Sequence, residues 1–136
     1  MSREAILCVD DEAIILMSLK QELRLSFGDR FTYETALNAD DARNIIEELT
    51  QDEVKVALII SDLLMPGTKG DEFLVEVKRQ HPDIRAIVIT GHADQAAVDR
   101  TMRETGADRV FHKPWRTEDL LKAVADCVDG PSGSER

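Results

Sequence analysis

Hydrophobic residues along the chain alternate between short continuous runs and longer stretches with a helical period. Five short runs have the length of strands: Ala5–Val9, Phe31–Ala36, Val56–Ser61, Ile84–Thr90 and Arg109–His112. Each is followed by a stretch in which apolar residues recur every three or four positions. Strand and helix therefore alternate five times. This order predicts a single α/β domain of the (βα)5 type, a doubly wound parallel sheet with helices on both faces.

The polarity of the strands and the residues at the helix ends refine this prediction. The first, third and fourth runs are almost continuously apolar, which predicts central strands that are buried on both sides. The second run mixes threonines and a glutamate with apolar residues and is typical of an edge strand. Asn38 and Thr117 stand where helix N-caps belong, and Gly106 stands where a glycine would close the fourth helix.

Length and tail composition indicate one domain. The chain has 136 residues, of which 43% are hydrophobic, enough for one compact core. We expect the domain to span residues 1–129. Residues 130–136, Gly-Pro-Ser-Gly-Ser-Glu-Arg, have the composition of a disordered tail or of the start of a linker.

Charge and cysteine content exclude several classes of function. The 27 acidic and 17 basic residues give a net charge of -10, which repels phosphate backbones and anionic lipids. We therefore expect no direct nucleic-acid or membrane binding. No apolar stretch has the length of a membrane span and the first residues do not resemble a signal peptide, so we expect a cytoplasmic protein. Cys8 and Cys127 suit reduced structural thiols.

Candidate chemistry is concentrated where the predicted strands end. Asp10 and Asp11 follow the first strand, Asp62 follows the third, Thr90 ends the fourth and Lys113 follows the fifth. Each has an ordinary explanation: an acid can cap a helix or form a turn, and a lysine before a proline is often solvated. Together they would meet at one edge of the sheet, where ligands of such folds bind. Carboxylates gathered there need a cation or shifted pKa values.

Four motifs carry a family resemblance. They are Val9-Asp10-Asp11-Glu12, Asp62-Leu63-Leu64-Met65-Pro66 with Gly70, Thr90-Gly91, and Lys113-Pro114-Trp115. In order and separation they resemble the receiver domains of two-component response regulators, over about residues 5–128. The resemblance implies the strand order 2-1-3-4-5.

The resemblance also implies a function for the acids. Asp62 would accept a phosphoryl group from a phosphohistidine, supplied by a sensor histidine kinase or a histidine phosphotransfer protein. Asp11 and Asp62 would bind Mg²⁺ directly, Asp10 would reach it through water, and the backbone carbonyl of Leu64 would complete the protein ligands. Such a protein promotes only its own phosphorylation and dephosphorylation, so we do not expect an enzyme with a separate substrate.

Two further residues would contact the phosphoryl group in such a domain. Lys113 would pair with one oxygen, its peptide to Pro114 being cis, and Thr90 would donate its hydroxyl to another. The inward movement of Thr90 would carry the fourth helix into a second packing. Receiver domains usually have an aromatic residue three positions before the lysine, but Val110 stands there, and Phe111 should point to the opposite face of the strand. We therefore expect the loop after Thr90 and the fourth helix to report phosphorylation.

The same surface suggests how partners bind. Ile14 lies off the main apolar stripe of the first helix, and Pro114 and Trp115 flank the reactive edge, so they could anchor the phosphoryl donor. Output would pass to a downstream effector protein or domain, or to a phosphorylation-dependent dimer.

Three alternatives remain open. The chain could be the receiver fragment of a longer regulator whose effector domain is absent. A phosphatase with an aspartate nucleophile is less favoured, because the family concerned has Asp-x-Asp where this chain has Asp10 followed by Glu12. A flavodoxin-like cofactor binder would want a phosphate-cradling loop, which Asp10, Asp11 and Glu12 would repel.

Overall fold

The computed structural model describes residues 3–62, 70–91 and 95–129, so Leu64 and the tail 130–136 lie outside the described residues. Strands and helices alternate along the chain. The strands are β1 (Arg3–Val9), β2 (Thr32–Ala36), β3 (Val54–Asp62), β4 (Arg85–Thr90) and β5 (Arg109–His112). The helices are α1 (Ala13–Phe27), a short 3-10 turn η1 (Gly28–Arg30), α2 (Ala39–Gln51), α3 (Gly70–Gln80), α4 (Gln95–Thr105) and α5 (Thr117–Asp129).

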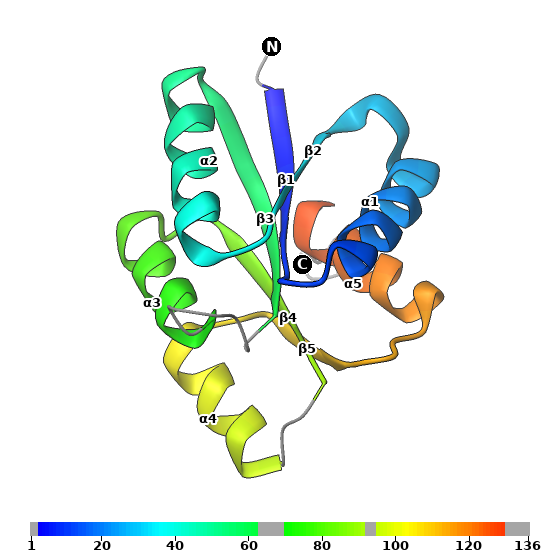
Figure 1. Ribbon diagram of the computed structural model, residues 1–136, viewed down its shortest axis with the longest axis vertical. Helices are drawn as coiled ribbons and strands as arrows, with labels where there is room; N and C mark the ends of the chain where they lie inside the picture. Colours follow the sequence, from blue (N-terminus) through cyan, green and yellow to red (C-terminus); the bar gives the residue numbers. More distant parts are fainter. Residues whose placement is uncertain (1–2, 63–69, 92–94, 130–136) are drawn as a thin grey trace.

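All neighbouring strands pair in parallel, in the order β2-β1-β3-β4-β5. Helices α1 and α5 cover one face of the sheet, and α2, α3 and α4 cover the other (Figure 1). The predicted fold class and strand order are confirmed, and β2 is an edge strand as its mixed polarity predicted.

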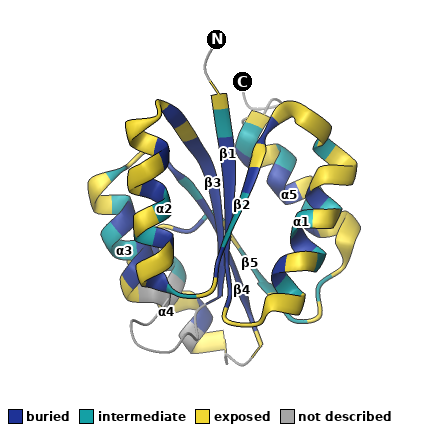
Figure 2. Cartoon of the chain, turned by 45° about the horizontal axis from the view of Figure 1, so that its top comes forward, coloured by how far each residue is buried: buried dark blue, intermediate teal, exposed yellow. Residues whose placement is uncertain are grey.

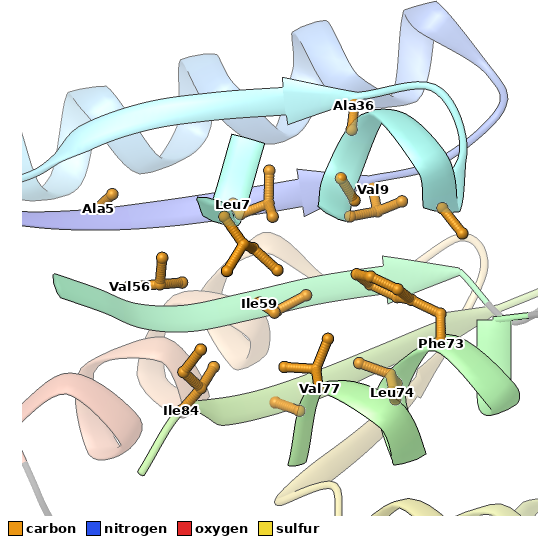
Figure 3. Packing of buried hydrophobic residues seen from close by; sticks show 14 of the residues in the cluster. Ala5, Leu7, Val9, Ala36, Val56, Ile59, Phe73, Leu74, Val77 and Ile84 are labelled. Carbon is orange, nitrogen blue, oxygen red and sulfur yellow. The ribbon is translucent and has the colours of Figure 1, made fainter. Parts of the chain in front are cut away.

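The sheet separates two hydrophobic cores. Alternate residues of β1 contribute to each, with Leu7 facing α2 and α3 and Ile6 facing α1 and α5. Figure 2 shows the central strands β1, β3 and β4 mostly buried between helices whose outer surfaces are exposed. In the first core, Leu7 and Ile59 from the sheet lie close to Val77 of α3 (Figure 3). Burial on both faces explains the continuous apolar runs in the sequence.

A one-residue bulge in β3 sets the direction of the residues that follow it. Ala5 of β1 lies opposite Val56, but the next residue, Ile6, lies opposite Leu58, so Ala57 is an extra residue. Because side chains alternate along a strand, this insertion moves every later residue of β3 to the other face. Asp62 consequently shares its face with Asp10, since Val9 pairs with Ser61 at the strand ends.

Helix ends largely follow their sequence signals. The Asn38 side chain accepts a hydrogen bond from the Asp41 backbone N–H at 2.8 Å, as expected of an N-cap. Gly106 follows the end of α4 with φ of 67°. The N-cap prediction for Thr117 is wrong by one residue, because Thr117 is helical and the Leu120 N–H already donates to the Arg116 carbonyl.

Both cysteines are free and buried. Burial raises the pKa of Cys8 to about 12 and that of Cys127 to about 11, so neither thiol is a reactive thiolate at neutral pH. Within the described residues, no helix combines the length and apolar character that crossing a membrane requires.

Glu53, in the turn between α2 and β3, has φ of 61°, a left-handed conformation that is costly for residues with a side chain. We expect Glu53→Gly to raise the free energy of unfolding by about 0.5–1 kcal/mol, the relief of strain exceeding the extra entropy of an unfolded glycine. Urea unfolding measures the difference. Asp52→Gly is the matched control, because Asp52 has φ of -84° and the same change there should destabilise. A loss of stability in the Glu53 variant would contradict this account.

Candidate functional site

The carboxyl ends of the strands bring the candidate residues together. Asp10 directly follows β1, Asp62 ends β3, and Lys113 directly follows β5. The Lys113 Nζ atom lies 2.8 Å from Asp10 Oδ2 and 3.0 Å from Asp62 Oδ2. One ammonium thus joins acids that stand 52 positions apart in the sequence (62 - 10). Parallel strands make this possible, because all of them end at the same edge.

Two of the three acids are deeply buried. Asp10 is 2% exposed and Asp62 is 5% exposed, whereas Asp11 is exposed. Asp10 is held in place at both ends, since its backbone N–H donates to the Ala36 carbonyl at 3.1 Å and its Oδ1 accepts from the Glu12 N–H at 2.8 Å. Two hydrogen bonds therefore fix Asp10 on the β1 side, and the site is open to solvent at Asp11.

Asp10, Asp11 and Asp62 form a cluster that could hold a metal ion. One oxygen from each carboxylate lies within 4.8 Å of the others. Magnesium prefers oxygen ligands and is commonly held by one or two carboxylates together with water molecules. The three carboxylates fit Mg²⁺, because they supply oxygen ligands. Asp11 is exposed, so water molecules can complete the coordination from that side.

Electrostatics at the site favour a bound cation. Burial raises the pKa of Asp10 above its ordinary value, despite the opposing effects of the hydrogen bonds from Lys113 and the Glu12 N–H; the charge of Asp62 raises it further. Burial alone would lower the pKa of Lys113, but its hydrogen bonds to Asp10 and Asp62 and their charges raise it overall. Lys113 is thus a permanent cation at neutral pH, and its single charge faces more than one carboxylate.

Glu12 contacts the lysine, which the sequence pattern did not predict. Its Oε1 lies 3.6 Å from Lys113 Nζ, while its side chain is 60% exposed. The sequence signal was present, since Glu12 is the third acid of the run Asp10-Asp11-Glu12, but the run alone does not show which acid turns toward the lysine.

Thr90 is fully buried, and among the described residues its hydroxyl has no hydrogen-bond partner. An unpaired buried hydroxyl is costly and calls for an explanation. Thr90 is also tied to the lysine strand, because its carbonyl accepts from the Lys113 N–H at 2.9 Å. A ligand oxygen at the strand ends would give this hydroxyl an acceptor.

The aromatic position differs from the usual pattern as expected. Val110 is partly buried against the core of α2, α3 and α4, together with Met102 of α4. Phe111 packs on the opposite face, against the core of α1 and α5. Phe111, the phenylalanine of β5, therefore lies on the face opposite to the one that Val110 shares with α4.

The proposed docking residues differ in exposure. Ile14 is 79% exposed on α1, and Pro114 is exposed after a cis Lys113–Pro114 peptide, as the resemblance implies. Trp115 is only partly exposed, because its ring packs against the core of α1 and α5. Its Nε1–H donates to Glu22 Oε1 at 3.2 Å. A groove of about 560 Å³ lies beside it, lined in part by Glu12, Ile15 and Lys113.

Comparison with known proteins shows the family. The model of the response regulator receiver domain matches residues 6–125, and the chain belongs to this family. Receiver domains bind Mg²⁺ at an acidic pocket of the kind formed here by the three aspartates.

Individual relatives share the fold and part of the sequence. The hydrogenase transcriptional regulatory protein HoxA of Cupriavidus necator is 34% identical over 124 residues, covering 91% of this chain and 24% of the relative. A signal receiver domain of an HD domain-containing protein from Pseudomonas fluorescens Pf-5 superposes with a TM-score of 0.82 at 26% identity, covering 98% of this chain and 100% of that one. The beryllofluoride-activated NtrC4 receiver domain dimer gives 0.80 at 29% identity, covering 92% and 96%. The chain spans about a quarter of the length of the first curated relatives it matches.

We predict that Asp10→Asn stabilises the metal-free protein at neutral pH while weakening Mg²⁺ binding. Because the pKa of Asp10 is raised on folding, its contribution to stability is full below the unfolded pKa and is lost as pH rises through the folded pKa. The neutral amide avoids this loss. The difference in free energy of unfolding between the variant and the parent should therefore narrow as pH falls toward the pKa of an ordinary aspartate.

Urea unfolding with a chelator present, repeated across acidic and neutral pH, measures this difference, and Mg²⁺ titration measures affinity. Asp83→Asn is the control, since Asp83 is exposed. If Asp10→Asn were less stable than the parent at neutral pH, the ion pair between Asp10 and Lys113 would stabilise the fold by more than burial of the carboxylate destabilises it.

Proposed function

We propose that this chain is the phosphoacceptor of a two-component phosphorelay and that Asp62 receives the phosphoryl group. The observation that carries the proposal is the position of Asp62, a buried carboxylate at a strand end that touches Lys113 and lies beside Asp10 and Asp11. The donor is the phosphohistidine of a sensor histidine kinase or of a histidine phosphotransfer protein.

The transfer is a displacement at phosphorus. An Asp62 carboxylate oxygen forms a new O–P bond while the P–N bond to the donor imidazole breaks, and the departing imidazole takes up a proton from solvent. The product is an acyl phosphate, held as a covalent intermediate. Such a transfer needs alignment and charge neutralisation more than covalent help from the protein.

Mg²⁺ would be held by Asp11 and Asp62 directly, by Asp10 through water and by the backbone carbonyl of Leu64, a residue outside the described part of the chain. When bound, it neutralises the negative charge of the phosphoryl oxygens. Lys113 supplies a second positive charge, and to meet a phosphoryl oxygen its ammonium has to loosen its contacts with Asp10 and Asp62. The bound Mg²⁺ would then compensate the negative charge of Asp10 in place of the lysine.

Thr90 would couple phosphorylation to conformation. Its hydroxyl, which has no partner within the described part of the chain, would gain an acceptor when a phosphoryl oxygen arrives, which favours the conformation in which Thr90 lies inward. Thr90 ends β4, whose Val88 lies on the α3 and α4 face. The loop after Thr90 and α4 would carry the signal, to a downstream effector protein, to an output domain outside this chain, or to a second copy. The dimer formed by the beryllofluoride-activated NtrC4 receiver domain supports the last of these routes.

The phosphoryl donor would dock on the face formed by the start of α1 and the loop after β5. Ile14 gives this face an exposed apolar anchor, and the groove beside Trp115 lies next to the lysine. Apolar and aromatic anchors of this kind often contribute much of the binding energy of an interface.

With acetyl phosphate and Mg²⁺ we expect the chain to gain one labile phosphoryl group, seen by intact-mass measurement. Asp62→Asn should abolish the gain, because an amide cannot form the acyl phosphate, whereas Asp83→Asn should retain it. A chelator should prevent labelling of the parent. A phosphoryl group that persists in the Asp62 variant, or continuous hydrolysis of the donor without a labelled protein, would overturn the proposal.

We expect Thr90→Val, but not Val110→Ala, to uncouple phosphorylation from the response of α4. Backbone amide chemical shifts of residues 95–105, recorded with and without acetyl phosphate, report the response. The valine also removes a buried hydroxyl that has no partner among residues 3–62, 70–91 and 95–129, so it should raise the free energy of unfolding by about 1 kcal/mol. Loss of the α4 response in Val110→Ala would show that the valine transmits the signal despite its small size.

A further inference from the structure

The loop that carries Lys113 is fastened to α1 by a hydrogen-bonded carboxylate. Glu22 is partly buried, and its Oε1 accepts from Trp115 Nε1–H at 3.2 Å. Its other oxygen, Oε2, accepts from the hydroxyl of Ser18 one turn earlier at 3.3 Å. Glu22 is therefore oriented by its own helix and directed at the loop. Hydrogen bonds to a carboxylate are among the stronger ones in proteins.

This contact lies close to the lysine in the chain. The Lys113 N–H still bonds to the Thr90 carbonyl at 2.9 Å, and α5 begins with the bond from the Leu120 N–H to the Arg116 carbonyl. Trp115 lies between these two backbone bonds. Its ring packs against the core of α1 and α5, and its N–H fixes the ring's direction through Glu22. The position of the backbone between Lys113 and the start of α5 thus depends on Trp115.

Glu22 itself does not belong to the acid cluster. The three carboxylates that lie within 4.8 Å of one another are those of Asp10, Asp11 and Asp62. Trp115 has no ionisable group. Neither residue has a direct chemical part in metal binding, which separates this contact from the proposed magnesium site.

We propose that Glu22 is a positioning residue that acts through Trp115 to hold Lys113 at the site of phosphoryl transfer. The inference rests on the proposed function, since it takes the role of Lys113 from there. It adds a residue of α1 whose loss should slow transfer without weakening metal binding. Small displacements of a catalytic group cost rate because transfer depends on alignment.

The test compares initial rates of phosphorylation by acetyl phosphate, at saturating Mg²⁺, in Glu22→Ala, Trp115→Phe and the double variant. We expect each single change to lower the rate about five- to tenfold, below the roughly hundredfold cost of a full 1 Å misplacement. If both act through one hydrogen bond, the double variant should be no slower than the slower single variant. Glu22→Gln keeps an acceptor oxygen and should remain within about twofold of the parent.

Two measurements separate positioning from a general loss of structure. Mg²⁺ affinity, measured by titration, should stay within about twofold in all of these variants, because the metal ligands lie on other elements. Gln21→Ala, an exposed neighbour on the same helix, controls for the change in helix propensity and should leave the rate unchanged. If Glu22→Ala proves too unstable to measure, Trp115→Phe and Glu22→Gln decide the question, since both retain most of the side chain.

Rates within about twofold of the parent in Glu22→Ala and Trp115→Phe would overturn the inference, as would effects that multiply in the double variant. A rate loss matched by an equal loss of Mg²⁺ affinity would also overturn it. None of these results touches the proposed function, which fails only if Asp62→Asn is still phosphorylated or the parent is not phosphorylated at all. The two failures are therefore distinguishable.

Discussion

The contact of one lysine ammonium with buried carboxylates is the interaction on which the site depends. Lys113 Nζ lies within 3.0 Å of both Asp10 and Asp62, in a part of the molecule where charges are poorly solvated. Losing the lysine would be expensive, because it would leave two buried carboxylates uncompensated, whereas neutralising Asp10 leaves the ammonium paired with Asp62. The parallel sheet is what makes the contact possible, since it delivers residues from β1, β3 and β5 to one edge.

Two features of this edge are unfavourable for the metal-free fold and favourable for its chemistry. Burial raises the pKa of Asp10, and the hydroxyl of Thr90 is buried without a partner among the described residues. Strain and unsatisfied groups of this kind are expected at functional sites, where a ligand supplies what the protein lacks. A cation would stabilise the charge of the buried Asp10, and a phosphoryl oxygen would accept a hydrogen bond from Thr90. Together the two features point to a cation and a phosphoryl group as the ligands of the site.

The sequence predicted the elements, their alternation and the edge at which the reactive residues meet. It could not predict the bulge at Ala57, because Val56–Ser61 is apolar almost throughout and shows no alternation that would reveal a change of face. If β3 continued in regular register with no bulge, Asp62 would lie opposite Asp11 and point away from Asp10. The contact between Glu22 and Trp115 was also beyond reach, since the two residues are 93 positions apart and a glutamate on a helix usually faces solvent.

The arrangement also divides Thr90 and Lys113, the two residues proposed to contact the phosphoryl group, between opposite faces of the sheet. Thr90 ends β4 on the side where Val88 and Val110 pack with Met102 of α4. Lys113 leads into Trp115, which packs on the side of α1 and α5 and is bonded to Glu22. A phosphoryl group that draws on both residues therefore acts on two separate cores at once. Because packed cores resist continuous deformation, each face can respond as a unit, so in the proposed mechanism α4 would carry output while α1 would hold the lysine in place. In the proposed mechanism, this division accounts for a valine at position 110.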